Sequence, residues 1–303
     1  MALNVKHDAP LAAQGLMFAL CGYMMLAVGD AIVKSMVPIW PATAIAALRY
    51  FLGAVGIGIL LLAKEGRSGF VLSNPLLHLG RAAAVSFSAV CFFMGVKFMP
   101  LAEATAISFM MPMFAGMLSA VLLREKASRA TWLTTAVAFV GVLIILRPNV
   151  AEVGLSALFP LGSAIGMAVL ILLNRRAAGT ASVLALQFNI AALSAPMLIA
   201  AAAIGDLSGL PGLDVGWPHW SVILRCAIVA VSASCAHALI FLATTRASAA
   251  TIAPMTYSQL IVALIIGALV FGDLPDLKSM FGSALIVGSG LYLWRSATPK
   301  RGA

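Results

Sequence analysis

Long apolar runs, separated by short polar connections, cover almost the whole chain. A helix that crosses a lipid bilayer needs about 20 mostly apolar residues. Ten runs meet this requirement, at roughly residues 12–33, 41–63, 79–98, 101–123, 130–147, 154–174, 181–204, 220–244, 249–271 and 277–295. The longest connection is 205–219, and the least marked boundary lies at Pro100, a residue that fits a turn. The pattern predicts an all-α polytopic membrane protein with ten transmembrane helices.

Composition supports this interpretation and excludes other classes. Hydrophobic residues make up 62% of the chain and charged residues 10%, against roughly 45–50% and 25% in soluble domains. A soluble enzyme, a disordered protein and a secreted disulfide scaffold are therefore excluded. The net charge of +9 does not indicate nucleic-acid binding, because most Lys and Arg lie between the apolar runs. The four cysteines lie inside apolar runs without a Cys-x-x-Cys pair, so neither a metal site nor a cofactor is expected.

The distribution of Lys and Arg predicts the orientation, since cytoplasmic connections are enriched in these residues. With both termini in the cytoplasm, thirteen fall on the inner side and five on the outer side. All five tryptophans lie at span ends, where amphipathic rings prefer the interface. The first run is too long for a signal-peptide core and is expected to be a retained span. We therefore expect a multi-pass protein of the bacterial cytoplasmic (inner) membrane, with short cytoplasmic tails at 1–11 and 296–303.

The two halves of the chain show a weak internal repeat. Shifting residues 115–147 by 148 positions places them on 263–295 without a gap, and Glu125 then matches Asp273. A five-helix unit starts on one side of the membrane and ends on the other, so two consecutive units must be inverted relative to each other. Many secondary transporters are built in this way. We expect two inverted five-helix repeats, at 12–147 and 154–295.

Several short motifs resemble a known family. The motifs are Glu103–Ile107 with Pro112, Leu122–Glu125, Gly141-Val142, Asp30–Lys34 and, more loosely in the second half, Phe271–Pro275. Together they resemble the EamA-type module of the drug/metabolite transporter superfamily. The resemblance implies ten helices as two inverted repeats, a central cavity and the movement of small metabolites.

Charged side chains inside the spans are the first candidates for function, because each costs about 2.5–3.5 kcal/mol on insertion scales. Arg49 lies about nine residues into the second span. It could bind a carboxylate or phosphate in a cavity, or it could extend to the outer interface or pair with Asp30. Asp30 and Lys34 are one helical turn apart, so an ion pair within the first span is expected.

Polar residues in the fourth and ninth spans give the second group of candidates. The ninth span contains four consecutive polar side chains from Thr256 to Gln259 after Pro254, and neighbours on a helix point about 100° apart. Interrupted helices at corresponding places in two halves often form a transporter's binding site, although prolines can kink helices and hydroxyls can link them without binding a ligand. His237 could bind substrate or switch its charge, or it could be a neutral imidazole hydrogen-bonded between helices.

These considerations give two predicted sets of residues. The predicted substrate-binding residues are His237, Tyr257, Gln259, Ser108, Thr105 and Arg49. The predicted gating or structural residues are Glu125, Asp273, Pro112, Pro254, Asp30 and Lys34.

The function predicted from these features is secondary transport by alternating access. The cargo is expected to be a small polar or amphipathic metabolite, such as an amino-acid-like compound or a vitamin. An intramembrane enzyme and a passive channel or receptor are the alternatives; the chain has neither a phosphate-binding loop nor a His-Glu-x-x-His motif, so it is not expected to be an enzyme. The expected partners are the substrate and the lipid bilayer, without nucleic acid, and a homodimer stays open.

Overall fold

A computed structural model describes residues 9–122, 129–153, 155, 158–246 and 252–297, and every regular element in these ranges is helical. The first half contains α1 (Ala9–Met36), α2 (Ala42–Glu65), η1 (Gly66–Phe70), α3 (Pro75–Phe98), α4 (Leu101–Ser108), α5 (Met111–Leu122) and α6 (Arg129–Val153). The second half contains α7 (Phe159–Ala177), α8 (Val183–Leu207), α9 (Trp220–Arg246), η3 (Ala253–Tyr257), α11 (Ser258–Ile266), η4 (Gly267–Phe271) and α12 (Leu277–Ala297).

Each of the ten predicted spans coincides with one helix or with consecutive helical segments, so the all-α prediction is confirmed. Within the described ranges, seven segments are long and apolar enough to cross a bilayer by themselves, and two shorter apolar segments lie at 132–146 and 277–293. The boundaries differ by a few residues. The third span begins at Pro75 rather than at 79, because the Asn74 side chain accepts a hydrogen bond from Leu77 N (3.3 Å) and caps the helix.

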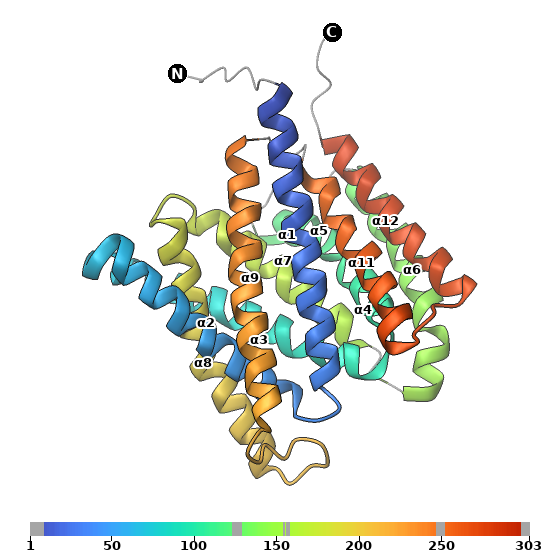
Figure 1. Ribbon diagram of the computed structural model, residues 1–303. Helices are drawn as coiled ribbons and strands as arrows, with labels where there is room; N and C mark the ends of the chain where they lie inside the picture. Colours follow the sequence, from blue (N-terminus) through green and yellow to red (C-terminus); the bar gives the residue numbers. More distant parts are fainter. Residues whose placement is uncertain (1–8, 123–128, 154, 156–157, 247–251, 298–303) are drawn as a thin grey trace.

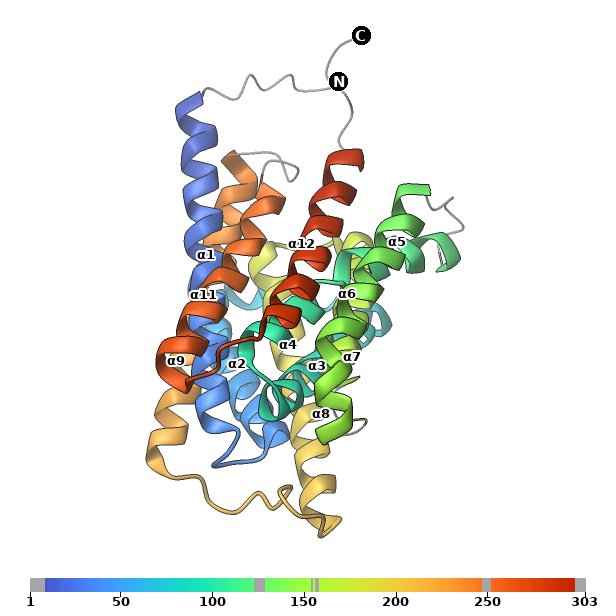
Figure 2. The same ribbon diagram turned by 90° about the vertical axis from the view of Figure 1, so that its right-hand side faces the viewer.

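The helix ends define two ends of the molecule. The start of α1 and the end of α12 lie at the same end (Figures 1 and 2), which we call the terminal end. The 208–219 connection lies at the opposite end, which we call the far end.

The helices pack in pairs that include one member from each half. The main pairs are α1 with α9, α3 with α7, α2 with α8, and α6 with α12, and α4 also contacts α11. The first to fifth spans of the chain can be exchanged, in order, for the sixth to tenth spans. This exchange turns the α1–α9 pair into the α7–α3 pair. The pairs α2–α8, α4–α11 and α6–α12 are each converted into themselves. The pairing scheme is therefore unchanged by exchanging the halves.

The α6–α12 pair shows that these two helices run antiparallel. A Cβ on Gly141 would lie 2.6 Å from the Gly282 carbonyl oxygen, and a Cβ on Gly282 would lie 2.6 Å from the Gly141 carbonyl oxygen. Gly141 also approaches Ile286, and Gly282 approaches Ile145, so the contacts advance in opposite directions along the two helices. Glycine at both positions permits this close backbone contact.

The buried apolar core is concentrated toward the far end. It includes Met36 at the end of α1, Ile45 at the start of α2, Phe93 near the end of α3, Ile107 in α4 and Cys226 near the start of α9. These segments meet where α1, α3 and α9 have their far ends. The two halves are thus packed tightly against each other at this end.

Candidate substrate-binding site

The fourth and ninth spans are both interrupted, as predicted from their prolines. Phe109 and Met110 separate α4 from α5, and Pro112 lies in the first turn of α5. In the ninth span, the 3₁₀ segment η3 contains Pro254 and ends at Tyr257, directly before α11. Residues 109 and 257 are 148 positions apart, which is the same shift that places residues 115–147 on 263–295.

Arg49 lies inside the helix assembly, beside two aromatic rings. Its guanidinium carbon is 5.2 Å from the Tyr50 ring centroid and 5.6 Å from the Phe93 ring centroid. Among the described residues it donates no hydrogen bond, and none of its nitrogen atoms is fully buried. It interacts electrostatically with Asp30 and His237. Arg49 is thus a cation held by ring faces, with its N–H donors available.

Asp30 is held by the second half of the chain and not by its neighbour on α1. Its Oδ2 atom accepts a hydrogen bond from the Gln259 amide of α11 at 2.8 Å. Lys34 instead forms an ion pair with Asp273 and donates a hydrogen bond to the Met99 carbonyl oxygen at 3.2 Å. The predicted ion pair between Asp30 and Lys34 is therefore wrong, because each partner binds a residue of another segment that the one-turn spacing cannot reveal.

His237 lies on the face of α9 that turns toward Arg49. Cys226, Ala230 and His237 lie along one stripe of this helix, and the first two are buried whereas His237 is exposed. Cys226 belongs to the buried core and is 0% exposed, so the stripe faces the interior. The interior face of α9 therefore becomes accessible toward the terminal end.

The face of α2 that carries Arg49 also becomes more accessible toward the terminal end. Ile45 is buried one turn before Arg49, whereas a Cβ on Gly53 or Gly56 after it would meet no atom within 4 Å. Arg49 thus lies where tight packing gives way to accessible surface. We call Asp30, Arg49, His237 and Gln259 the polar cluster, and they come from α1, α2, α9 and α11.

Tyr257 has a different environment from the polar cluster. Its ring contacts Phe109 edge-to-face, with the centroids 5.4 Å apart, and its hydroxyl lies against Gly290 of α12. Phe109 and Tyr257 lie at the two span interruptions. The structure therefore places Tyr257 in the contact between these interruptions.

The hydroxyls of Thr105 and Ser108 bind their own helix. Thr105 Oγ1 donates to the Leu101 carbonyl at 2.8 Å, and Ser108 Oγ donates to the Ala104 carbonyl at 2.9 Å. Thr105 is only 1% exposed. The structure does not bring either residue into the polar cluster, and Glu125 lies outside the described residues.

Contacts between the halves hold the far end together. The Lys34–Asp273 ion pair joins α1 to the segment after η4, where Gly272 adopts a positive φ of 69° and turns the chain. Trp40 Nε1 donates a hydrogen bond to the Val215 carbonyl oxygen, and Arg225 Nη1 donates to Ser35 Oγ at 3.3 Å. We call the Lys34–Asp273 pair the far-end latch.

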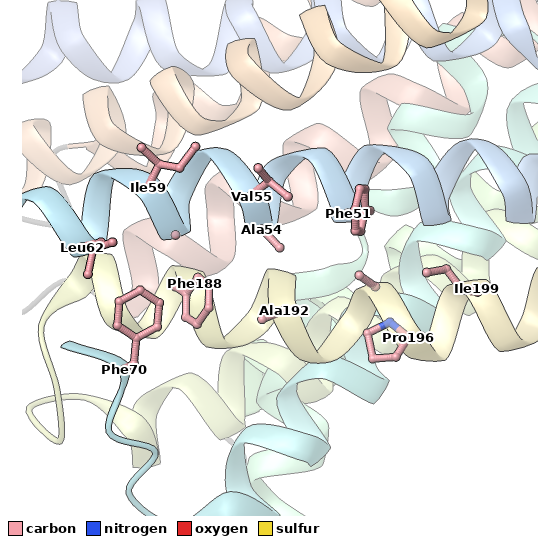
Figure 3. Close-up of a pocket in the computed structure, with 12 residues that line it drawn as sticks. Phe51, Ala54, Val55, Ile59, Leu62, Phe70, Phe188, Ala192, Pro196 and Ile199 are labelled. Atoms are coloured by element: carbon pink, nitrogen blue, oxygen red, sulfur yellow. The ribbon is translucent and has the colours of Figure 1, made fainter. Parts of the chain in front are cut away.

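An apolar groove lies between α2 and α8 (Figure 3). It has a volume of about 620 Å³, and its walls include Phe51 and Val55 of α2 and Phe188 of α8. Phe70 lies at one end, where its ring contacts Phe188 at a centroid distance of 4.9 Å. Helical spacing puts Phe51 and Val55 on the side of α2 away from Arg49. The groove is therefore separate from the polar cluster.

A buried polar contact between α3 and α7 was not predicted from the sequence. Arg81 Nε donates to Asn174 Oδ1 at 2.8 Å, and Arg81 Nη1 lies 2.9 Å from His78 Nδ1. Arg81 is only 3% exposed. The helix-start signal Asn74-Pro75 could have indicated this contact, because the signal places Arg81 in the second turn of α3. Among the described residues, no three His, Cys, Asp or Glu side chains are grouped as metal ligands.

Comparison with known proteins identifies the family. The profile of the EamA-like transporter family matches this chain twice, at residues 13–147 and 154–294. The chain belongs to the EamA-like transporter family. It is therefore a membrane transporter of small molecules and not an enzyme, as the sequence predicted.

Several relatives of this chain carry names that state a cargo. The S-adenosylmethionine uptake transporter of Rickettsia bellii is 24% identical over 254 residues, which cover 82% of each chain. The riboflavin transporter of Vibrio cholerae is 24% identical over 303 residues, which cover 98% of this chain and 97% of its own. A solved crystal structure matches with a TM-score of 0.60 over 94% of this chain and 99% of its own; at 18% identity it supports the fold alone.

Proposed function

We propose that this transporter moves a small polar or amphipathic metabolite across the bacterial cytoplasmic membrane, with the polar cluster as its binding site. The observation that carries this proposal is that charged and polar side chains from both halves meet inside the helix assembly. Asp30 and Arg49 come from the first half, and His237 and Gln259 come from the second. Ionisable residues inside spans are expensive and usually functional. The names of the two relatives agree with a vitamin or an amino-acid-like cargo.

The arrangement supports alternating access by two inverted repeats. The packing pairs stay the same when the halves are exchanged, and α6 runs antiparallel to α12. The span interruptions are also 148 positions apart, in the shift that matches the two halves. Rocking of one repeat against the other around a fixed central site is the motion that such a construction permits.

The orientation proposed for the protein makes the terminal end cytoplasmic, in agreement with the excess of Lys and Arg on that side. In that orientation the far-end latch closes the extracellular side, and the accessible faces around Arg49 and His237 open toward the cytoplasm. Cargo release into the cytoplasm, or cargo loading from it, takes place in this state. Opening of the far end then requires separation of Lys34 from Asp273.

Untargeted metabolite comparison of cells with and without the protein tests the function and gives the direction of transport. The expected result is a changed level of a small polar metabolite, and the same compound should then move into proteoliposomes with saturable kinetics and counterflow. Counterflow separates a transporter from a passive channel, because only an alternating site exchanges labelled for unlabelled cargo. Unsaturable flux without counterflow would contradict alternating access.

A further inference from the structure

The polar cluster holds two opposite charges that do not neutralise each other directly. Asp30 and Arg49 interact electrostatically, but within the described ranges no salt bridge joins them. The Asp30 carboxylate accepts a hydrogen bond from the neutral Gln259 amide, and Lys34, one turn away, is paired with Asp273. Each charge of the cluster thus keeps the capacity to bind an ionic group of opposite sign.

Arg49 is prepared for a planar anion. The aromatic faces of Tyr50 and Phe93 hold the guanidinium, and attraction to a ring face leaves the N–H groups free. A guanidinium presents five N–H donors in a fixed plane and binds a carboxylate through two parallel hydrogen bonds. The open space after Arg49, where Gly53 and Gly56 meet no atom within 4 Å, leaves room for a ligand beside it.

Asp30 supplies the complementary position. The Gln259 hydrogen bond fixes one carboxylate oxygen, Oδ2, and orients the group. A carboxylate accepts through two oxygens, so a cationic group can bind the same side chain. Arg49 and Asp30 would be stabilised by forming a direct ion pair with each other. Their separation leaves both charges available to a ligand.

We propose that the cargo is a zwitterion of the amino-acid type, an inference that rests on the proposed function. The carboxylate of the cargo binds Arg49, and its cationic group binds Asp30. A ligand that lacks either charge leaves one ion of the cluster without its counter-ion, and an unpaired ion in a desolvated site is expensive. The cluster therefore selects cargo by the presence of both charges.

Competition in proteoliposomes tests this selection on the unaltered full-length protein. The transported tracers are labelled S-adenosylmethionine, L-methionine and riboflavin. S-adenosylmethionine and L-methionine carry an α-ammonium and an α-carboxylate, and riboflavin carries neither. We expect at least one zwitterionic tracer to be transported and riboflavin not to be. Methionine amide, which lacks the carboxylate, and N-acetylmethionine, which lacks the cation, should compete about tenfold or more weakly than methionine.

Two variants assign the charges to their residues. Arg49→Gln should remove the disadvantage of methionine amide relative to methionine, and Asp30→Asn should remove that of N-acetylmethionine. Arg49→Lys, which keeps the charge but loses the planar donor pair, should retain part of the discrimination and covers the case in which Arg49→Gln does not fold. The matched controls are Arg67→Gln in η1 and Asp214→Asn in the far-end connection; both residues are exposed.

The outcomes separate this inference from the proposed function. Transport of riboflavin without a zwitterionic tracer, or a metabolite comparison that finds a cargo lacking either charge, overturns the zwitterion inference and leaves the transporter intact. Equal competition by all three methionine compounds also overturns it. If no tracer moves and the metabolite comparison shows no difference, the proposed function fails and this inference fails with it.

Discussion

The rings of Phe109 and Tyr257 meet edge-to-face, with centroids 5.4 Å apart, although 148 residues separate them in the sequence. Phe109 follows the last residue of α4, and Tyr257 is the last residue of η3. Each of the two residues lies at the interruption of its own span. The two span interruptions therefore contact each other through aromatic side chains.

This contact predicts that the Tyr257 ring matters more than its hydroxyl. Tyr257→Ala should lower the free energy of unfolding by about 2–3 kcal/mol, less than the cost of removing a fully buried ring because Tyr257 is only partly buried, and it should impair transport. Tyr257→Phe should transport at the wild-type rate, because it keeps the ring pair. A double-mutant cycle with Phe109→Ala should give a coupling of about 0.5–1.5 kcal/mol by thermal unfolding in detergent. Loss of transport in Tyr257→Phe would instead favour a direct role of the hydroxyl in substrate binding.

The far-end latch predicts a charge-dependent gate. Lys34→Ala or Asp273→Ala should destabilise the closed far end by about 1.5–3 kcal/mol, since the side chains are only 13% and 26% exposed. Thiol labelling at the far end should then increase and the transport rate should change. The charge-swapped variant, with Lys34→Asp and Asp273→Lys together, should restore much of the protection. Lys278→Ala, at an exposed position of α12, is the control and should behave as wild type.

The close contact of α6 and α12 predicts a marked difference between two glycines of α12. Gly282→Ala places a methyl group 2.6 Å from the Gly141 carbonyl oxygen, so the helices must move apart. The free energy of unfolding should fall by about 1–3 kcal/mol. Gly288→Ala meets no atom within 4 Å and should be neutral or stabilising by up to about 1 kcal/mol, because alanine favours a helix. Equal thermal stability of the two variants would contradict the described α6–α12 contact.

Features whose signal lies within one segment of the chain could be predicted from the sequence. The ten spans could be predicted from continuous apolar runs, and the interruptions from Pro112 and Pro254, because bilayer thickness and proline geometry act locally. The partners of Asp30 could not be predicted in this way. Spacing within α1 suggested Lys34, whereas the hydrogen bond comes from Gln259, more than 200 residues away.

For the same reason, the structure brings only some of the predicted binding residues together. Arg49, His237 and Gln259 come together in the polar cluster, whereas the hydroxyl of Thr105 is already donated within α4. A sequence shows that a hydroxyl is present in a span, but the choice between a ligand and the carbonyl four residues earlier depends on which face the helix buries. The contact of Arg81 could not be predicted either, since its partner Asn174 belongs to the other half.

The proposed orientation predicts opposite labelling of the two ends. Single cysteines at Arg67 and Asp214 can be introduced into a background in which the four native cysteines are replaced by alanine. Both positions are exposed, the first in η1 and the second in the 208–219 connection. In intact cells, a membrane-impermeant maleimide should label Asp214→Cys and should label Arg67→Cys only after permeabilisation. Labelling of both positions from outside would contradict the arrangement of spans, and the reversed pattern would place the terminal end outside.

His237 provides a direct test of the polar cluster, because its imidazole is exposed on the face of α9 that turns toward Arg49. His237→Ala removes one hydrogen-bonding group from the site without disturbing a buried contact. The apparent affinity for the cargo should fall about threefold to tenfold, the usual effect of a lost hydrogen bond, while the amount of protein in the membrane stays constant. His237→Gln keeps a donor and an acceptor and should lose less. His219→Ala is the matched control, since His219 is exposed in the far-end connection and bonds to Ser221 at 2.9 Å. Wild-type affinity in His237→Ala, with normal insertion, would show that cargo binds elsewhere and would remove α9 from the binding site.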